Sequence, residues 1–277
     1  MLNKNQSYAI FARHTRQTLF ALAIAAVSFA SCKDDDNPKP DGGKPANEDK
    51  GLLPEKDQLY SYKITDSEGS ESSSEMKVIN VKDSSGIAVY NIENLIQEGD
   101  DKVKTNNRAF VKDGLTTYEL SYPEGLNSIT TYVRTFAVIE DYSLTGFPQR
   151  QIFEHKGTVD SKLTFSKEPV RMKLGLLIPI GEDDNIEANL ECKVTYHDGE
   201  VTKQEKITTP AGTFNCSKWV YDYELYTKLT GKDIPDEVSE VVYTVELWTA
   251  PGVGIVKTIE ASGKDITTTE LQKITKQ

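Results

Sequence analysis

The chain has 277 residues, with 32 Lys and Arg, 43 Asp and Glu and a formal net charge of −11. This acidic balance argues against a nucleic-acid partner, because binding to phosphates needs clustered Lys and Arg. Three cysteines and three histidines exclude a disulfide-dense scaffold and leave little material for a His/Cys metal site. We therefore expect neither a metal nor a cofactor.

The N-terminus has the pattern of a secretory signal. Lys4, Arg13 and Arg16 form a positive region without an acidic residue, and the apolar run Leu19–Ala30 follows it. This run is too short to span a bilayer core of about 30 Å, which takes roughly 20 residues. It fits the apolar region of a signal peptide, which we assign to residues 1–31.

Cys32 follows the small residues Ala30 and Ser31. This junction resembles the bacterial lipobox, in which the signal is cut before a cysteine that then carries lipid. Phe29 stands where that pattern prefers Leu. The resemblance implies that Cys32 carries acyl chains such as palmitate and that the protein contacts a membrane through them. Several acyl chains anchor a protein stably, at about 0.8 kcal/mol per buried CH₂.

The next residues, Lys33, Asp34, Asp35 and Asp36, resemble the signal that sends lipoproteins of Bacteroidota to the outer face of the outer membrane. The resemblance implies a lipid-anchored protein of the outer membrane that faces the cell exterior. The alternative interpretation is a solvated acidic linker. Residues 32–57 are rich in Asp, Lys, Pro and Gly, so beyond the lipidated cysteine we expect a disordered tether with a reach of about 25–30 Å.

From residue 58 onward the dominant period is two, which is typical of β-strands. Apolar and polar residues alternate through residues 186–197, which predicts a strand with one buried and one wet face. Asp198-Gly199 then indicates a hairpin turn. The best helical candidates, residues 91–98 and 232–238, are short. The sequence thus predicts an all-β fold: a single antiparallel β domain over residues 58–277, built as a strongly curved sheet or incomplete barrel with short helices at most.

Two turn motifs lie in the C-terminal part of the chain. Pro210 and Gly212 belong to TPAGTF and predict a tight turn, and Pro251, Gly252 and Gly254 belong to APGVGIVK and suit a type II turn. Together the motifs resemble secreted and lipoprotein β domains of unknown function from Gram-negative bacteria. That group is similar in architecture to the carriers that move lipoproteins across the periplasm. The resemblance implies a curved sheet around an apolar hollow and no catalytic residue.

Cys192 and Cys216 lie in predicted strands. If residues 186–197, 201–208 and 213–225 form a meander, the outer two strands are roughly 9.5 Å apart. A disulfide needs Cα atoms within about 7 Å. The meander therefore predicts two free, buried cysteines.

Five aromatic residues are the candidate ligand-binding side chains. Trp219, Tyr221 and Tyr223 share one face of a predicted strand, and Tyr243 and Trp248 lie on the next hairpin. Core packing, a hollow for an apolar or lipid ligand and an exposed platform for sugar rings all suit them. The direction in which the rings point distinguishes these interpretations.

No Walker loop, GxGxxG, HExxH, CxxC or GxSxG motif occurs, so we expect no enzymatic activity. These features favour a membrane-anchored lipoprotein that binds an apolar or lipid ligand. The alternative is a surface glycan-binding or protein-interaction module. A hydrolase, the third alternative, would need two carboxylates with perturbed pKa values in one cleft. The sequence leaves the oligomeric state and the biological partner open.

Overall fold

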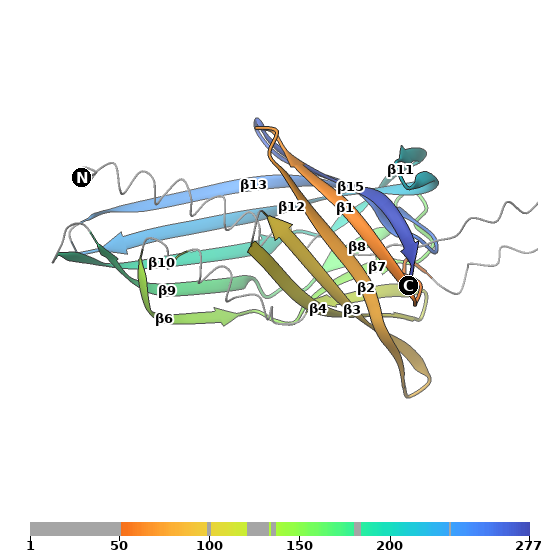
Figure 1. The fold of residues 1–277 in the computed structure, drawn as a ribbon, viewed down its shortest axis with the longest axis horizontal. Coiled ribbons are helices and arrows are strands. Elements are labelled where there is room, and N and C mark those ends of the chain that lie inside the picture. Colours follow the sequence, from red (N-terminus) through yellow and green to blue (C-terminus); the bar gives the residue numbers. More distant parts are fainter. Residues whose placement is uncertain (1–50, 99–100, 121–132, 134–136, 180–183, 233) are drawn as a thin grey trace, which may run out of the picture.

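The computed structural model describes residues 51–98, 101–120, 133, 137–179, 184–232 and 234–277. They form one antiparallel sheet of fifteen strands (Figure 1). The strands up to residue 165 are β1 (Gln58–Asp66), β2 (Glu71–Ser84), β3 (Ile87–Glu98), β4 (Asp101–Lys112), β5 (Leu115–Leu120), β6 (Val138–Thr145), β7 (Gln149–Glu154) and β8 (Lys162–Phe165). The later strands are β9 (Val170–Pro179), β10 (Asn185–Tyr196), β11 (Gly199–Thr209), β12 (Gly212–Gly231), β13 (Ile234–Ala250), β14 (Gly254–Ser262) and β15 (Asp265–Lys276).

Twelve of these strands close into a barrel. The order around it is β1-β2-β3-β4-β5-β7-β8-β11-β12-β13-β14-β15. β15 pairs with β1, and β11 pairs with both β8 and β12. The predicted all-β class and the strongly curved antiparallel sheet are confirmed. The barrel closes because β11 joins β8 to β12.

The other three strands form an extension of the sheet. They continue from the second half of β12 in the order β10-β9-β6 and project beyond the barrel with the ends of β12 and β13 (Figure 1). β12 is 20 residues long and reaches both parts. It pairs with β11 as far as Val220 and with β10 from Tyr223 onward.

Strict alternation of apolar and polar residues explains why the chain forms strands in the extension. In β10, Ile186, Ala188 and Leu190 are buried while the residues between them are exposed. Successive side chains of a strand point to opposite faces, so this pattern gives the strand one apolar face. One core cluster contains buried apolar residues from both the barrel and the extension, among them Leu174, Leu190 and Tyr60.

β10 and β11 run on as one nearly continuous strand along β12. Tyr196 and Glu200 both pair with residues of β12, and between them the backbone N–H of His197 donates a hydrogen bond to the carbonyl of Asp222 at 2.9 Å. The predicted hairpin turn at Asp198-Gly199 is therefore wrong, and so is the meander that assumed it.

Asp198-Gly199 instead marks the bend at which the strand leaves β9 and meets β8. A Cβ atom on Gly199 would lie 2.3 Å from the carbonyl oxygen of Val220. The glycine thus permits a close approach to β12. A dipeptide that favours turns serves here to bend a paired strand.

Cys192 and Cys216 are free and buried, as predicted, but for a different reason. Cys192 lies opposite Thr227 on β12, whereas Cys216 lies on β12 itself, eleven positions earlier. At about 3.3 Å per residue, this places the two cysteines on the order of 35 Å apart along the strand.

We expect both thiols to react with Ellman's reagent only after unfolding. Burial raises the pKa of Cys192 well above its ordinary range and that of Cys216 to about 12, so little reactive thiolate forms at neutral pH. A Cys32→Ala chain, titrated without reductant, should show both thiols in denaturant and neither in buffer. A missing thiol in denaturant would contradict the assignment.

Residues 91–98 and 234–238 are strands, not the helices that the sequence predicts. Ile92, Leu95 and Ile96 have helix-like spacing, but Ile92, Asn94 and Ile96 alternate inward in β3. Asn94, a polar residue on the inward face, interrupts the alternation of apolar and polar residues by which a strand is recognised in the sequence. For the same reason the pattern does not reveal β4, which buries Thr105 and Asn107.

Residues 51–57, which the sequence analysis assigns to the tether, pack against the barrel. Leu52 and Leu53 are buried in the core cluster. The backbone N–H of Leu52 donates to the Thr116 hydroxyl at 3.3 Å, and the Tyr118 hydroxyl donates to the Leu52 carbonyl. The folded part therefore includes the chain from Gly51. Burial of the two leucine side chains attaches this otherwise polar segment to the core.

Candidate functional site

The barrel wall places polar side chains in the interior. Asn94 on β3 lies directly opposite Thr105 on β4, and Asn107 follows on the same face of β4. Their relative exposures are 2%, 1% and 2%. Short polar side chains are thus buried at three adjacent inward positions of two neighbouring strands.

The side-chain polar atoms of these three residues have no hydrogen-bond partner in the described part of the chain. Both amide atoms of Asn94 and of Asn107 and the hydroxyl of Thr105 are unpartnered. Other buried polar atoms that share this property are those of Tyr60 (OH), Ser74 (Oγ), Gln149 (Oε1), Tyr221 (OH) and Thr258 (Oγ1). A buried unsatisfied group costs about 1–3 kcal/mol, and native proteins keep few of them.

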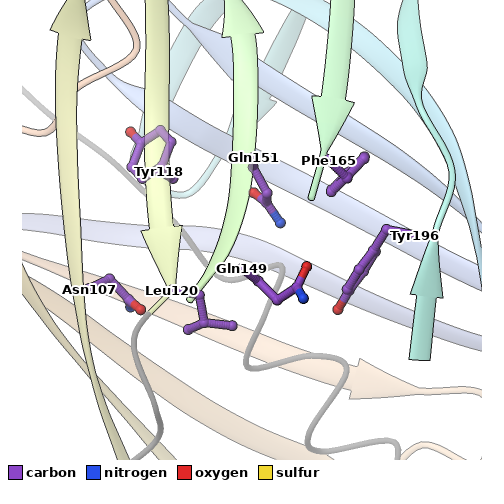
Figure 2. A pocket seen from close by; sticks show the side chains of 7 residues that line it. All are labelled: Asn107, Tyr118, Leu120, Gln149, Gln151, Phe165 and Tyr196. Carbon is purple, nitrogen blue, oxygen red and sulfur yellow. The ribbon is translucent and has the colours of Figure 1, made fainter. Parts of the chain in front are cut away.

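Two of these side chains line one small interior cavity. Asn107 and Gln149 bound it together with five other residues: Tyr118, Leu120, Gln151, Phe165 and Tyr196 (Figure 2). The cavity volume is about 10 Å³, which is room for about one water molecule. The amide end of Gln149 points toward the Tyr196 ring (Figure 2), and its nitrogen donates to the Glu168 carbonyl at 2.7 Å. The unpartnered amide groups of Asn107 and Gln149 therefore face a cavity that is large enough for one water molecule.

The five predicted aromatic residues are all buried, with exposures between 0% and 9%. Tyr221, Tyr223 and Tyr243, here called the tyrosine cluster, are connected through two other rings. Phe165 contacts Tyr221 at 4.8 Å and Tyr196 at 5.1 Å, and Tyr196 contacts Tyr223 at 5.7 Å. The rings of Tyr223 and Tyr243 stack at 4.9 Å. Since Phe165 also lines the small cavity, this tyrosine cluster adjoins it. None of the five forms an exposed platform of the kind that stacks on sugar rings.

The two tryptophans have contacts of their own. Trp219 packs edge-on against Phe153 at 5.1 Å and donates from Nε1 to the Thr249 hydroxyl at 2.7 Å. Trp248 donates to Glu205 at 2.9 Å, and Lys218 Nζ lies 4.9 Å from its ring. Both indoles are held by hydrogen bonds and contacts within the fold.

Glu260 on β14 is an interior residue that the sequence analysis does not identify. It is 3% exposed, and it accepts a hydrogen bond from the Tyr223 hydroxyl at 2.7 Å. Burial raises the pKa of this carboxyl to about 7, against the lowering effect of the Tyr223 bond. The inward alternation of Val256, Thr258 and Glu260 is the signal that could have found it.

The interior is poor in charge. Glu119 and Glu260 are the buried charged residues of the described chain, which buries no Lys, Arg or His. Glu119 forms ion pairs with the half-exposed Arg108 and Arg150. It alternates with the inward-facing Tyr118 and so points outward. The hydrolase alternative would require two carboxylates in one cleft. Glu119 and Glu260 do not meet this requirement, because they lie on opposite faces of the sheet.

Both turn motifs are at strand ends. Thr209 pairs with Gly212, so Pro210 lies in the two-residue loop between β11 and β12. Pro251 and Gly252 lie between β13 and β14, where Gly252 has a φ of 68°.

The β13–β14 turn also holds the start of the folded chain. The backbone N–H of Val253 donates to the Ala250 carbonyl at 2.9 Å, and that of Gly252 donates to the Gly51 carbonyl at 3.1 Å. Gly254, which begins β14, has a φ of 75°. This motif thus secures residue 51 beside the barrel.

The predicted lipid attachment site Cys32 and the export signal Lys33, Asp34, Asp35 and Asp36 lie outside the described residues. Within the described ranges, no group of three or more His, Cys, Asp or Glu side chains could hold a metal ion. No helix there is long and apolar enough to cross a membrane.

Residues 178–271 match the DUF3108-like family, and this range contains both turn motifs. The fold is similar to that of a "putative lipoprotein" from Parabacteroides distasonis, with a TM-score of 0.51 and 18% identity over 81% of this chain and 98% of that chain. A "putative exported protein with YmcC-like fold" from Bacteroides fragilis gives a TM-score of 0.47 and 14% identity over 82% and 99%. No curated protein matches the sequence. At this identity the first likeness shows a shared fold.

Proposed function

We propose that this protein is an exported lipoprotein, anchored through acylated Cys32 in the outer membrane and facing the cell exterior. The positive N-terminus, the Leu19–Ala30 run and the Ala30-Ser31-Cys32 junction support this proposal. The folded part begins no later than Gly51, because Leu52 and Leu53 lie in the core. At most residues 33–50 then separate the lipid from the barrel.

We further propose that the barrel acts by binding an apolar or amphipathic small molecule in its interior rather than by catalysis. The observation that carries this proposal is the set of buried, unpartnered polar groups around Asn94, Thr105 and Asn107. Replacing such groups by apolar ones of the same shape would be neutral or stabilising. Their presence is explained if a bound molecule supplies the missing hydrogen bonds.

The surroundings suit a molecule with both polar and apolar parts. The small cavity is lined by the aromatic rings of Tyr118, Phe165 and Tyr196 as well as by amides. Phe165 continues into the tyrosine cluster through Tyr221. Binding sites of small molecules combine a mostly apolar lining with a few placed polar groups. The resemblance to periplasmic carriers that the turn motifs imply in the sequence adds a fold-level analogy.

Mass spectrometry of an organic extract tests this proposal. The chain with Cys32→Ala cannot be acylated, so any lipid in its extract is bound non-covalently. We expect a co-purifying amphiphile in stoichiometric amount after purification without detergent. The same protein, unfolded in denaturant, washed and refolded, serves as the control for adhering lipid. An empty extract together with no binding of any added amphiphile would refute the proposal.

A further inference from the structure

The small cavity offers hydrogen bonds but no charge. Asn107 presents an unpartnered donor and an unpartnered acceptor, and Gln149 presents an unpartnered carbonyl oxygen. Both side chains are more than nine-tenths buried and line the same space (Figure 2). Among the residues that the structure describes, no Lys, Arg or His lines this cavity.

We propose that this cavity seats an uncharged polar head of the bound amphiphile, such as a hydroxyl group, and that the barrel interior rejects anionic heads. This inference rests on the proposed function and names the class of ligand. A hydroxyl group both donates and accepts a hydrogen bond. The two amides around the cavity can complement it in both directions.

The rejection of anions follows from the interior charges. A carboxylate or phosphate loses several kcal/mol of hydration on burial unless cations replace the water. Proteins meet this cost with Arg, Lys or helix N-termini, and the described residues bury no cationic side chain. Glu260, the buried carboxyl on the inner face among the described residues, adds repulsion once it is ionised.

The cavity volume also limits the group that fits. About 10 Å³ admits one water-sized group. A phosphate has four oxygens and needs several donors, whereas one hydroxyl group can take the place of one water. The adjoining rings of Phe165 and Tyr196, which stack at 5.1 Å, then offer an apolar surface to the rest of the ligand.

The test compares three amphiphiles that share one palmitoyl chain and differ in the head: 1-monopalmitoylglycerol, palmitate and 1-palmitoyl-lysophosphatidic acid. Each is titrated into the Cys32→Ala chain by calorimetry at pH 8, below its micellar concentration. We expect monopalmitoylglycerol to bind at least roughly tenfold more tightly than either anionic amphiphile. This difference in Kd corresponds to about 1.4 kcal/mol of binding free energy. Equal or tighter binding of an anionic head overturns the inference and leaves the proposed function standing.

A matched pair of variants locates the head. Asn107→Leu should weaken binding of monopalmitoylglycerol roughly tenfold, through the loss of a buried hydrogen bond. Asn91→Leu changes another asparagine of β3, whose amide donates to Asn80 at 2.7 Å and which does not line the cavity, so we expect unchanged affinity. Thermal melting of both variants shows that they are folded. Unchanged affinity in Asn107→Leu would contradict the assigned head site, and no binding of any of the three amphiphiles would refute the proposed function itself.

Discussion

Replacing Leu52 and Leu53 together by alanine should destabilise the barrel by several kcal/mol, although both residues precede the first strand. Each is at most 5% exposed and lies in the core cluster. Leu→Ala at a buried site costs about 2–5 kcal/mol, since transfer free energy is lost and a cavity remains. Chemical denaturation of the Cys32→Ala chain, with and without the double substitution, measures the difference.

Leu115→Ala is the matched control, because Leu115 is 37% exposed at the start of β5. We expect its effect to stay near 1 kcal/mol or below. A double variant as stable as this control would show that residues 52 and 53 belong to the tether after all. The same comparison bears on truncation: a chain that starts at residue 58 should be much less stable than one that starts at residue 51.

The second large effect concerns Glu260 and pH. Its pKa is raised by burial to about 7, against an ordinary value of 4.5. The folded protein therefore holds this proton more tightly than the unfolded chain does. Stability then falls as the pH rises from about 4.5 to 7 and levels off above that range, at a loss on the order of 3 kcal/mol.

Glu260→Gln removes this loss, so the variant should be more stable than the unaltered chain at pH 8 and nearly equal to it at pH 4.5. Glu240→Gln, at an exposed position of β13, is the control and should follow the unaltered chain at both pH values. Denaturation midpoints at the two pH values measure these differences. A Glu260→Gln variant without any gain at pH 8 would show that the carboxyl is solvated or paired in the native protein.

The parts of the fold that the sequence predicts are those where local pattern and tertiary pairing agree. The strand predicted over residues 186–197 is β10, Asn185–Tyr196, within one residue at each end. The hairpin expected at Asp198-Gly199 fails because β12 supplies hydrogen-bond partners on both sides of the bend. A single sequence does not reveal that one strand is 20 residues long and serves two neighbours.

The candidate site is hidden from the sequence for a related reason. β4 lacks an alternating pattern because Thr105 and Asn107 occupy positions where an apolar residue would mark a strand. Glu260 looks like a surface charge until its register beside Val245 and Thr267 places it inside. By contrast, Trp219, Tyr221 and Tyr223 could be assigned to one face of a strand from their spacing, and the pairing of Tyr223 with Tyr243 adds the latter. Residues that break a local rule are expected at functional sites.

The pairing of β1 with β15 delays closure of the barrel until β15 has been made. β1 is the first barrel strand to be synthesised, and it can pair with β15 only when residues 265–276 have been added. Even the terminal Gln277 donates a backbone hydrogen bond, to the Asp57 carbonyl at 2.8 Å. Contacts so distant in sequence form slowly, and unpaired strand edges favour aggregation until they do. A nascent chain of this fold therefore keeps an open barrel edge until β15 has been made.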